Sequence, residues 1–84
     1  MNKKVEVYTW TFCPFCVKVK QLLESEGVDY TEHNIQGNKE ALTALKERTG
    51  SGTVPQVFVN EMFYGGCDDV YDLYNDGKFD AVFK

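Results

Sequence analysis

The chain has 84 residues, of which 43% are hydrophobic and 26% charged, and its net charge is −4 at pH 7. This length and composition predict one globular domain over residues 1–84, without a linker. The acidic balance argues against a nucleic-acid surface, which needs clustered lysine and arginine, and no apolar stretch is long enough to cross a bilayer. The first residues lack the apolar run of a signal peptide, so we expect a cytoplasmic protein.

The first half of the chain predicts a β-α-β unit. Residues 4–9 alternate β-branched residues with polar and aromatic ones, which indicates a strand. The segment that follows has a helical period and ends at Gly27. Its apolar stripe consists of Phe15, Val19, Leu22 and Leu23. Residues 28–35 return to β character with polar residues at alternate positions, so we expect a partly exposed strand. Two strands joined by a helix in this way run parallel, with a right-handed crossover.

The second half predicts a helix, a hairpin and one or two closing helices. Asn38 can cap a helix that ends at Gly50, with Ala41, Leu42 and Leu45 facing inward. Residues 55–60 and 62–64 have the composition of two strands, joined tightly through Asn60 and Glu61. Val70, Leu73 and Tyr74 then recur at helical spacing, and a last short helical piece contains Phe79, Val82 and Phe83. The order β-α-β-α-β-β-α predicts an α/β domain, with helices on both faces of a four-stranded mixed sheet.

Cys13 and Cys16 form a CxxC pair where the first predicted helix begins. With Cys13 as the N-cap, Pro14 takes the first helical position, where its missing N–H costs nothing. Unpaired backbone N–H groups and the helix dipole then favour a thiolate on Cys13, at an exposed mouth. Cys16 lies one turn further in, more enclosed and close enough to attack a mixed disulfide on Cys13. The pair therefore predicts a nucleophile and a resolving thiol.

A zinc site and a structural disulfide are the alternatives for this pair. A CxxC can supply half of a zinc site, and Cys67 with His33 could complete four ligands. Zinc ligands usually come as a second close pair, whereas these two residues are scattered singly, so we expect no metal. A structural disulfide is disfavoured because bridging so short a loop gains little unfolded-state entropy.

Two further motifs contain candidate binding residues. A cis bond between Val54 and Pro55 would leave the Val54 backbone able to pair with an extended peptide, although a trans proline that opens the strand is the commoner case. In GGCDD, residues 65–69, the glycines let a ligand approach the backbone, and the helix start offers N–H groups to a carboxylate. Asp68 or Asp69 could pair with an ammonium group or simply cap the helix. Such a set suits the α-amino acid end of a ligand such as glutathione.

Over nearly its full length the chain resembles the dithiol glutaredoxins, through CPFC (13–16), TVP (53–55) and GGCDD (65–69) in the family's order and spacing. The resemblance implies a thioredoxin-like fold, a cis Pro55 and a monomeric enzyme. It also implies that glutathione is the reductant for glutathione mixed disulfides and protein disulfides, with Cys13 and Cys16 catalytic. The glutathione-binding residues that it implies are Phe15, Thr53, Val54, Pro55, Gly66, Cys67, Asp68 and Asp69. Cys67 is expected to be a small helix-start residue rather than a third redox thiol.

The sequence departs from the family's pattern at two positions. Phe15 stands where the family often has tyrosine, so a phenol hydroxyl is missing. Trp10 stands three residues before the first cysteine, where the family often has a lysine near the thiolate and the glutathione carboxylate. Trp10 is equally well interpreted as a packing residue at a strand end.

Two other functions stay open. One is a thioredoxin-like electron donor, for instance to ribonucleotide reductase, that a flavoprotein reductase reduces. The GGCDD motif favours the glutathione enzyme, because such a donor has no use for a glutathione pocket. The other is an iron–sulfur carrier, a dimer bridged by a cluster on Cys13 and glutathione. Pro14 and Cys16 disfavour it, because the first stiffens the helix start and the family members with that role lack the second cysteine.

Overall fold

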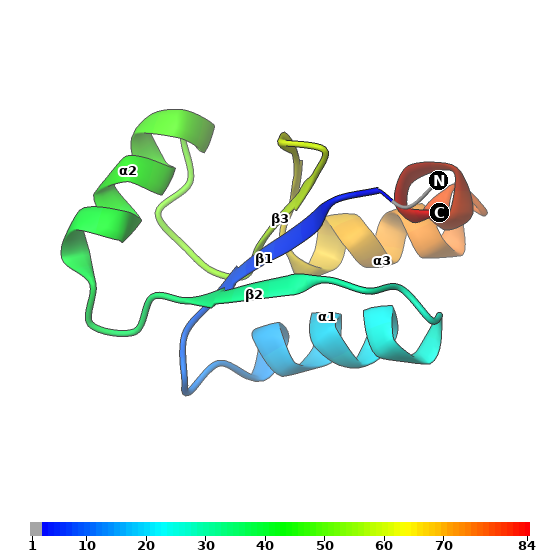
Figure 1. Cartoon of the computed structure of the whole chain (residues 1–84), viewed down its shortest axis with the longest axis horizontal. Helices are drawn as coiled ribbons and strands as arrows, with labels where there is room; N and C mark the ends of the chain where they lie inside the picture. Colours follow the sequence, from blue (N-terminus) through cyan, green and yellow to red (C-terminus); the bar gives the residue numbers. More distant parts are fainter. Residues whose placement is uncertain (1–2) are drawn as a thin grey trace.

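The strand and helix patterns fold into one central sheet with helices on both of its faces (Figure 1). The computed structural model describes residues 3–84. In chain order the elements are β1 (Val5–Thr9), α1 (Pro14–Ser25), β2 (Thr31–Asn34), α2 (Lys39–Thr49), β3 (Gln56–Val59), β4 (Met62–Gly65), α3 (Cys67–Asn75) and α4 (Phe79–Phe83). This is the predicted order, with the short last helical piece present as α4. No helix within residues 3–84 is long and apolar enough to span a membrane.

The four strands lie in the order β2-β1-β3-β4. β1 and β2 are parallel and are connected through α1, while β3 is antiparallel to both β1 and β4. The predicted β-α-β unit and hairpin are both confirmed. Asn60 and Glu61 have φ angles of 50° and 69°, the left-handed conformation that a two-residue type I′ turn requires at both central positions.

The alternation along β1 decides which helix covers which face of the sheet. Val5 and Val7 point into the larger core, formed with α1, α3 and α4. Tyr8 and Trp10 point to the opposite face and pack with Leu45 of α2 in a smaller cluster. Figure 1 shows α1 and α2 on opposite sides of the sheet, so the prediction of helices on both faces is confirmed.

The stripe of α1 differs from the prediction at one position. Phe15 is 57% exposed, and Cys16 instead joins Val19, Leu22 and Leu23 on the buried side of the helix. Successive helical residues are rotated by about 100°, so residues 16, 19 and 23 can face the sheet together while residue 15 cannot. The prediction that Phe15 belongs to the buried stripe was wrong.

The ends of α2 follow directly from local side-chain chemistry. The Asn38 side chain accepts a hydrogen bond from the backbone N–H of Ala41 at 3.0 Å, as the N-cap was predicted to do. At the other end, Gly50 has a φ of 80°, a left-handed conformation that glycine adopts without a steric penalty.

Candidate active site

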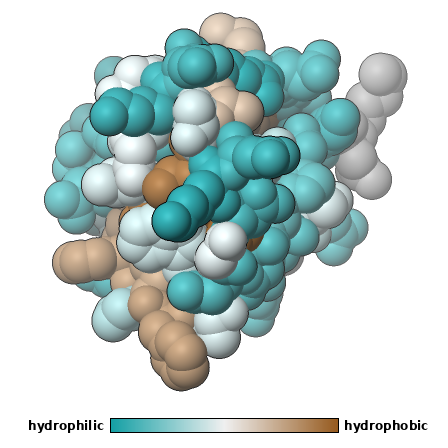
Figure 2. Space-filling view, turned by 90° about the vertical axis from the view of Figure 1, so that its left-hand side faces the viewer, coloured by the Kyte–Doolittle hydropathy of each residue, from teal (hydrophilic) through white to brown (hydrophobic). Residues whose placement is uncertain are grey.

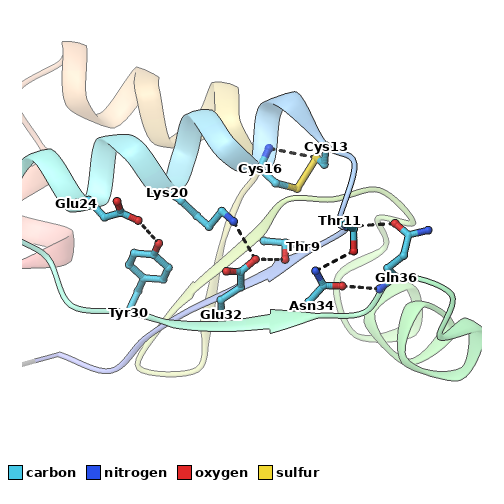
Figure 3. A network of polar contacts seen from close by, with 10 residues as sticks. All are labelled: Thr9, Thr11, Cys13, Cys16, Lys20, Glu24, Tyr30, Glu32, Asn34 and Gln36. Atoms are coloured by element: carbon cyan, nitrogen blue, oxygen red, sulfur yellow. Dashed lines mark hydrogen bonds and ion pairs between the residues drawn. A yellow bond between two sulfur atoms is a disulfide. The ribbon is translucent and has the colours of Figure 1, made fainter.

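The loop after β1 leads directly into the two cysteines. Cys13 is the N-cap of α1, and its sulfur accepts a hydrogen bond from the backbone N–H of Cys16 at 3.1 Å. Pro14 follows at the start of the helix, as predicted. A disulfide joins Cys13 to Cys16, whose Cα atoms are 5.2 Å apart (Figure 3). After reduction, an N–H group aimed at the Cys13 sulfur favours the thiolate over the thiol, because it donates to the charged form.

The two cysteines differ in their access to solvent. Cys16 is 1% exposed and Cys13 is 9% exposed. The prediction that Cys13 occupies an exposed mouth was therefore wrong for the disulfide state. The carbonyl oxygen of Val54 lies 4.0 Å from the Cys13 sulfur, so a loop from another part of the chain partly covers it. Cys13 is still the more exposed of the two residues, which is the order that a nucleophile and a resolving thiol require.

The loop before β3 carries a cis peptide bond between Val54 and Pro55, as the resemblance implies. Gln56, which is fully buried, anchors this loop. Its side-chain amide donates hydrogen bonds to the carbonyls of Ser51 at 2.6 Å and Thr53 at 2.9 Å. The anchoring role of Gln56 was not predicted; the signal was a polar residue at the start of an otherwise apolar strand.

A groove of about 350 Å³ opens beside the disulfide. The start of α1, the loop before β3, β4 and the start of α3 all contribute to its walls. It brings together every residue for which the resemblance implies glutathione binding, namely Phe15, Thr53, Val54, Pro55, Gly66, Cys67, Asp68 and Asp69. Ser51, Phe63 and Gly65 also line it, and the sequence analysis did not single them out for binding. Phe63 could have been suspected as a large apolar residue on a short edge strand, whereas nothing in the sequence indicated Ser51.

The two aspartates at the start of α3 have different partners. Asp69 accepts a hydrogen bond from the backbone N–H of Gly66 at 2.9 Å, so it caps the helix. The carboxylate of Asp68 is exposed and has no hydrogen-bond or salt-bridge partner within residues 3–84. Of the two roles that the sequence left open, capping belongs to Asp69, and Asp68 stays available to a ligand.

Close packing explains why the two residues before α3 are glycines. Gly65 has a φ of 100°, and a Cβ atom at that position would collide with the side chain of Asp69. A Cβ atom on Gly66 would lie 3.2 Å from the carbonyl oxygen of Pro55. The start of α3 can therefore approach the loop before β3 closely, and the floor of the groove between them is backbone.

Cys67 and His33 do not form a metal site with the dithiol. Cys67 is buried in the larger core, and burial raises the pKa of its thiol, which keeps it protonated and unreactive. His33 Nε2 lies 2.8 Å from Glu6 Oε2, and its ring stacks on Tyr8. Among residues 3–84 there is no group of three or more histidine, cysteine, aspartate or glutamate side chains that could hold a metal ion.

Trp10 packs in the smaller cluster with Ile35, Leu45 and Phe58, as its interpretation as a packing residue predicts. The two lysines that follow the cysteines on α1 also have partners. Lys20 pairs with Glu32, and the ammonium of Lys18 lies 4.7 Å from the centre of the Tyr71 ring.

Exposed aromatic residues flank the dithiol. Phe12 lies on the loop before Cys13, Phe15 lies in the first turn of α1, and both are exposed. Figure 2 views the molecule from the left-hand side of Figure 1. It shows apolar side chains gathered along the lower left edge of a mainly hydrophilic face. Cys13 therefore has exposed apolar side chains on both sides of it in the sequence.

The lowered pKa values of two carboxylates near the sheet predict how the free energy of unfolding depends on pH. A hydrogen bond with His33 holds the pKa of Glu6 below its ordinary value of 4.5, and one from Thr9 does the same for the pKa of Glu32. Because the folded pKa values lie below the unfolded ones, each carboxylate adds stability above pH 4.5 that is lost as the pH falls through the folded pKa.

We therefore expect the free energy of unfolding to decrease as the pH falls below about 5, by at most about 1 kcal/mol per carboxylate because both are partly exposed. Urea unfolding at a series of pH values measures this dependence. Glu32→Gln should flatten it, and an unchanged slope in that variant would contradict the assignment to Glu32.

The chain is similar to known proteins over almost its whole length. The family model described as Glutaredoxin matches residues 5–64. A probable glutaredoxin of Synechocystis is 42% identical over 98% of this chain and 94% of its own length. Glutaredoxin 3 of Escherichia coli is 42% identical over 95% of this chain and 96% of its own length.

Solved structures agree with this similarity. A buckwheat glutaredoxin in complex with glutathione superimposes with a TM-score of 0.89 at 31% identity, over 96% of this chain and 76% of that one. A glutaredoxin from Brucella melitensis gives a TM-score of 0.88 at 36% identity, over 99% of this chain and 90% of that one. The chain thus belongs to the glutaredoxin family, and its close Cys13–Cys16 pair makes it a thiol–disulfide oxidoreductase.

Proposed function

We propose that this oxidoreductase uses glutathione as its reductant, with Cys13 as the nucleophile and Cys16 as the resolving thiol. The lining of the groove is the main observation that supports this proposal. Residues from four separate parts of the chain line one cavity, and its Val54 carbonyl lies 4.0 Å from the Cys13 sulfur. The structural similarity to a glutaredoxin that binds glutathione supports the same ligand.

The groove offers a complementary group to each part of the γ-glutamyl end of glutathione. The first backbone N–H groups of α3 have no partner within the helix and suit the α-carboxylate. The exposed carboxylate of Asp68 suits the ammonium group. The backbone of Val54 can pair with the cysteinyl part of the ligand and so direct its sulfur toward Cys13.

The proposed reaction has two steps. The Cys13 thiolate attacks the glutathione sulfur of a mixed disulfide, the old S–S bond breaks, and the substrate leaves as a thiolate that takes up a proton. A second glutathione thiolate then attacks the glutathione sulfur bonded to Cys13. Glutathione disulfide leaves, and the Cys13 thiolate is restored.

The source of electrons tests the proposal. A glutathionylated protein is supplied either with glutathione and glutathione reductase, or with thioredoxin reductase and NADPH. We expect turnover with the first supply and little with the second. Turnover only with thioredoxin reductase would identify a thioredoxin-like donor and overturn the proposal.

Asp68→Ala tests the glutathione groove separately from the chemistry of the cysteines. We expect KM for glutathione to rise about fivefold with kcat unchanged, because an exposed ion pair contributes up to about 1 kcal/mol. Asp72→Ala is the matched control, since Asp72 is exposed on the same helix and does not line the groove. Equal KM values for the Asp68→Ala and wild-type enzymes would move the ammonium contact to another group.

A further inference from the structure

A polar network lies between α1 and the sheet, below the dithiol (Figure 3). The ammonium of Lys20 lies 3.0 Å from Glu32 Oε2, and the hydroxyl of Thr9 donates a hydrogen bond to the same oxygen at 2.6 Å. The Lys20 and Glu32 side chains are 25% and 32% exposed, while Thr9 is fully buried. A half-buried charge pair held by a buried hydroxyl has a defined position, which an exposed surface pair does not.

The register of α1 places this network next to the resolving cysteine. Lys20 follows Cys16 by four residues, so the two Cβ atoms are about 5–6 Å apart on one side of the helix. Figure 3 shows both side chains on the side of α1 that faces β1 and β2. Lys18, in contrast, turns toward Tyr71 of α3.

Cys16 needs help to ionise. It is 1% exposed, and burial disfavours a thiolate. In the resolving step, the thiol of Cys16 loses its proton and its sulfur attacks the Cys13 sulfur of the mixed disulfide. The bond from Cys13 to the glutathione sulfur breaks, and that sulfur leaves with the electron pair and takes up a proton. The products are the Cys13–Cys16 disulfide and one reduced glutathione.

We propose that Lys20 promotes ionisation of Cys16 in this step, and that Glu32, held by Thr9, fixes the ammonium in place and limits its effect. Lys20 is then a positioning residue, because it acts through Cys16 and touches neither reacting sulfur. The inference rests on the resolving role proposed for Cys16. The other charged or titratable groups on the elements packed here are Cys13 and Lys18 on α1 and Cys67, Asp68 and Tyr71 on α3. Of these, Cys13 is replaced in every protein used for the titration below, and Lys18 is replaced only in a control variant.

The charges of the pair can be removed with little change in shape. Lys20→Met keeps most of the apolar stem, and Glu32→Gln keeps an oxygen that can accept from Thr9. Each change is made in the reduced Cys13→Ser protein, where the ultraviolet absorbance of the thiolate follows the titration of Cys16. The absorbance of a Cys13→Ser/Cys16→Ser protein gives the contribution of Cys67 and the tyrosines, which is subtracted.

If Lys20 acts through its charge, the two single variants should shift the thiolate fraction of Cys16 in opposite directions. At a pH below the pKa of Cys16, Lys20→Met should lower its thiolate fraction about threefold and Glu32→Gln should raise it about threefold, as suits a partly exposed charge. The double variant should return close to the starting value, and Lys18→Met should change little. Equal shifts in one direction, or none, would show that the network is only structural and overturn the proposal.

The intact dithiol enzyme gives the second measurement, the rate at which glutathione leaves the Cys13 mixed disulfide at pH 7. The single variants should change this rate in the same order as the thiolate fraction. If Cys16→Ser releases glutathione as fast as the unchanged enzyme, the resolving role proposed for Cys16 fails. The titration of Cys16 then still decides separately whether Lys20 acts on its thiol.

Discussion

Cys13→Ser is expected to abolish reduction of both glutathione mixed disulfides and protein disulfides. Cys13 is the more exposed residue of the pair, and the backbone N–H of Cys16 donates a hydrogen bond to its sulfur at 3.1 Å. That N–H and the start of α1 favour a thiolate on Cys13, and a serine oxygen can neither ionise near neutral pH nor form a disulfide.

Two measurements check this loss. Turnover with glutathione and a glutathionylated protein should fall to the uncatalysed rate, and mass spectrometry should find no glutathione attached to the variant after exposure to glutathione disulfide. A far-ultraviolet circular dichroism spectrum equal to that of the wild type excludes misfolding as the cause. Substantial turnover by Cys13→Ser would mean that Cys16 is the attacking thiol and that the assignment of the two roles is reversed.

Cys16→Ser is expected to separate the two activities. If glutathione itself attacks the mixed disulfide on Cys13, reduction of a glutathionylated protein does not need Cys16 and should persist or rise. It can rise because the intramolecular reaction that diverts the intermediate into the Cys13–Cys16 disulfide is no longer available. Reduction of a protein disulfide should lose most of its rate, because the covalent complex on Cys13 can no longer be resolved from within the enzyme.

The same preparation of Cys16→Ser is assayed with a glutathionylated protein and with a protein disulfide under identical glutathione concentrations. The wild-type enzyme, assayed under the same conditions, is the reference for both rates. An enzyme that is inactive toward glutathionylated protein after Cys16→Ser would contradict the glutathione mechanism. An unchanged rate with the protein disulfide would contradict the resolving role.

Much of the fold could be predicted because its signals are local. The N-cap at Asn38, the end of α2 at Gly50 and the two-residue turn through Asn60 and Glu61 depend on residues within one turn of the chain. The spacing of Cys13, Pro14 and Cys16 likewise sets the start of α1 without any distant contact. The order of the predicted elements was enough to expect helices on both faces of the sheet.

The tertiary structure decided what surrounds the cysteines, because those contacts join segments far apart in the sequence. The cover over Cys13 comes from the Val54 carbonyl, across a sequence separation of 41 residues. The buried side of α1 begins at Cys16 rather than at Phe15, because packing against the sheet sets the rotation of a helix and the apolar pattern only approximates it.

The charge pair near Cys16 also depends partly on the local sequence and partly on tertiary packing. The sequence by itself determined that Lys20 lies one turn after Cys16, because helical periodicity is a local property. That Lys20 meets Glu32 and Thr9 depends on β2 lying parallel to β1 under α1, since Thr9 and Glu32 lie on neighbouring strands. Only the packed sheet brings these groups within hydrogen-bond distance, because the strand order is set by burying the whole apolar face rather than by any one segment.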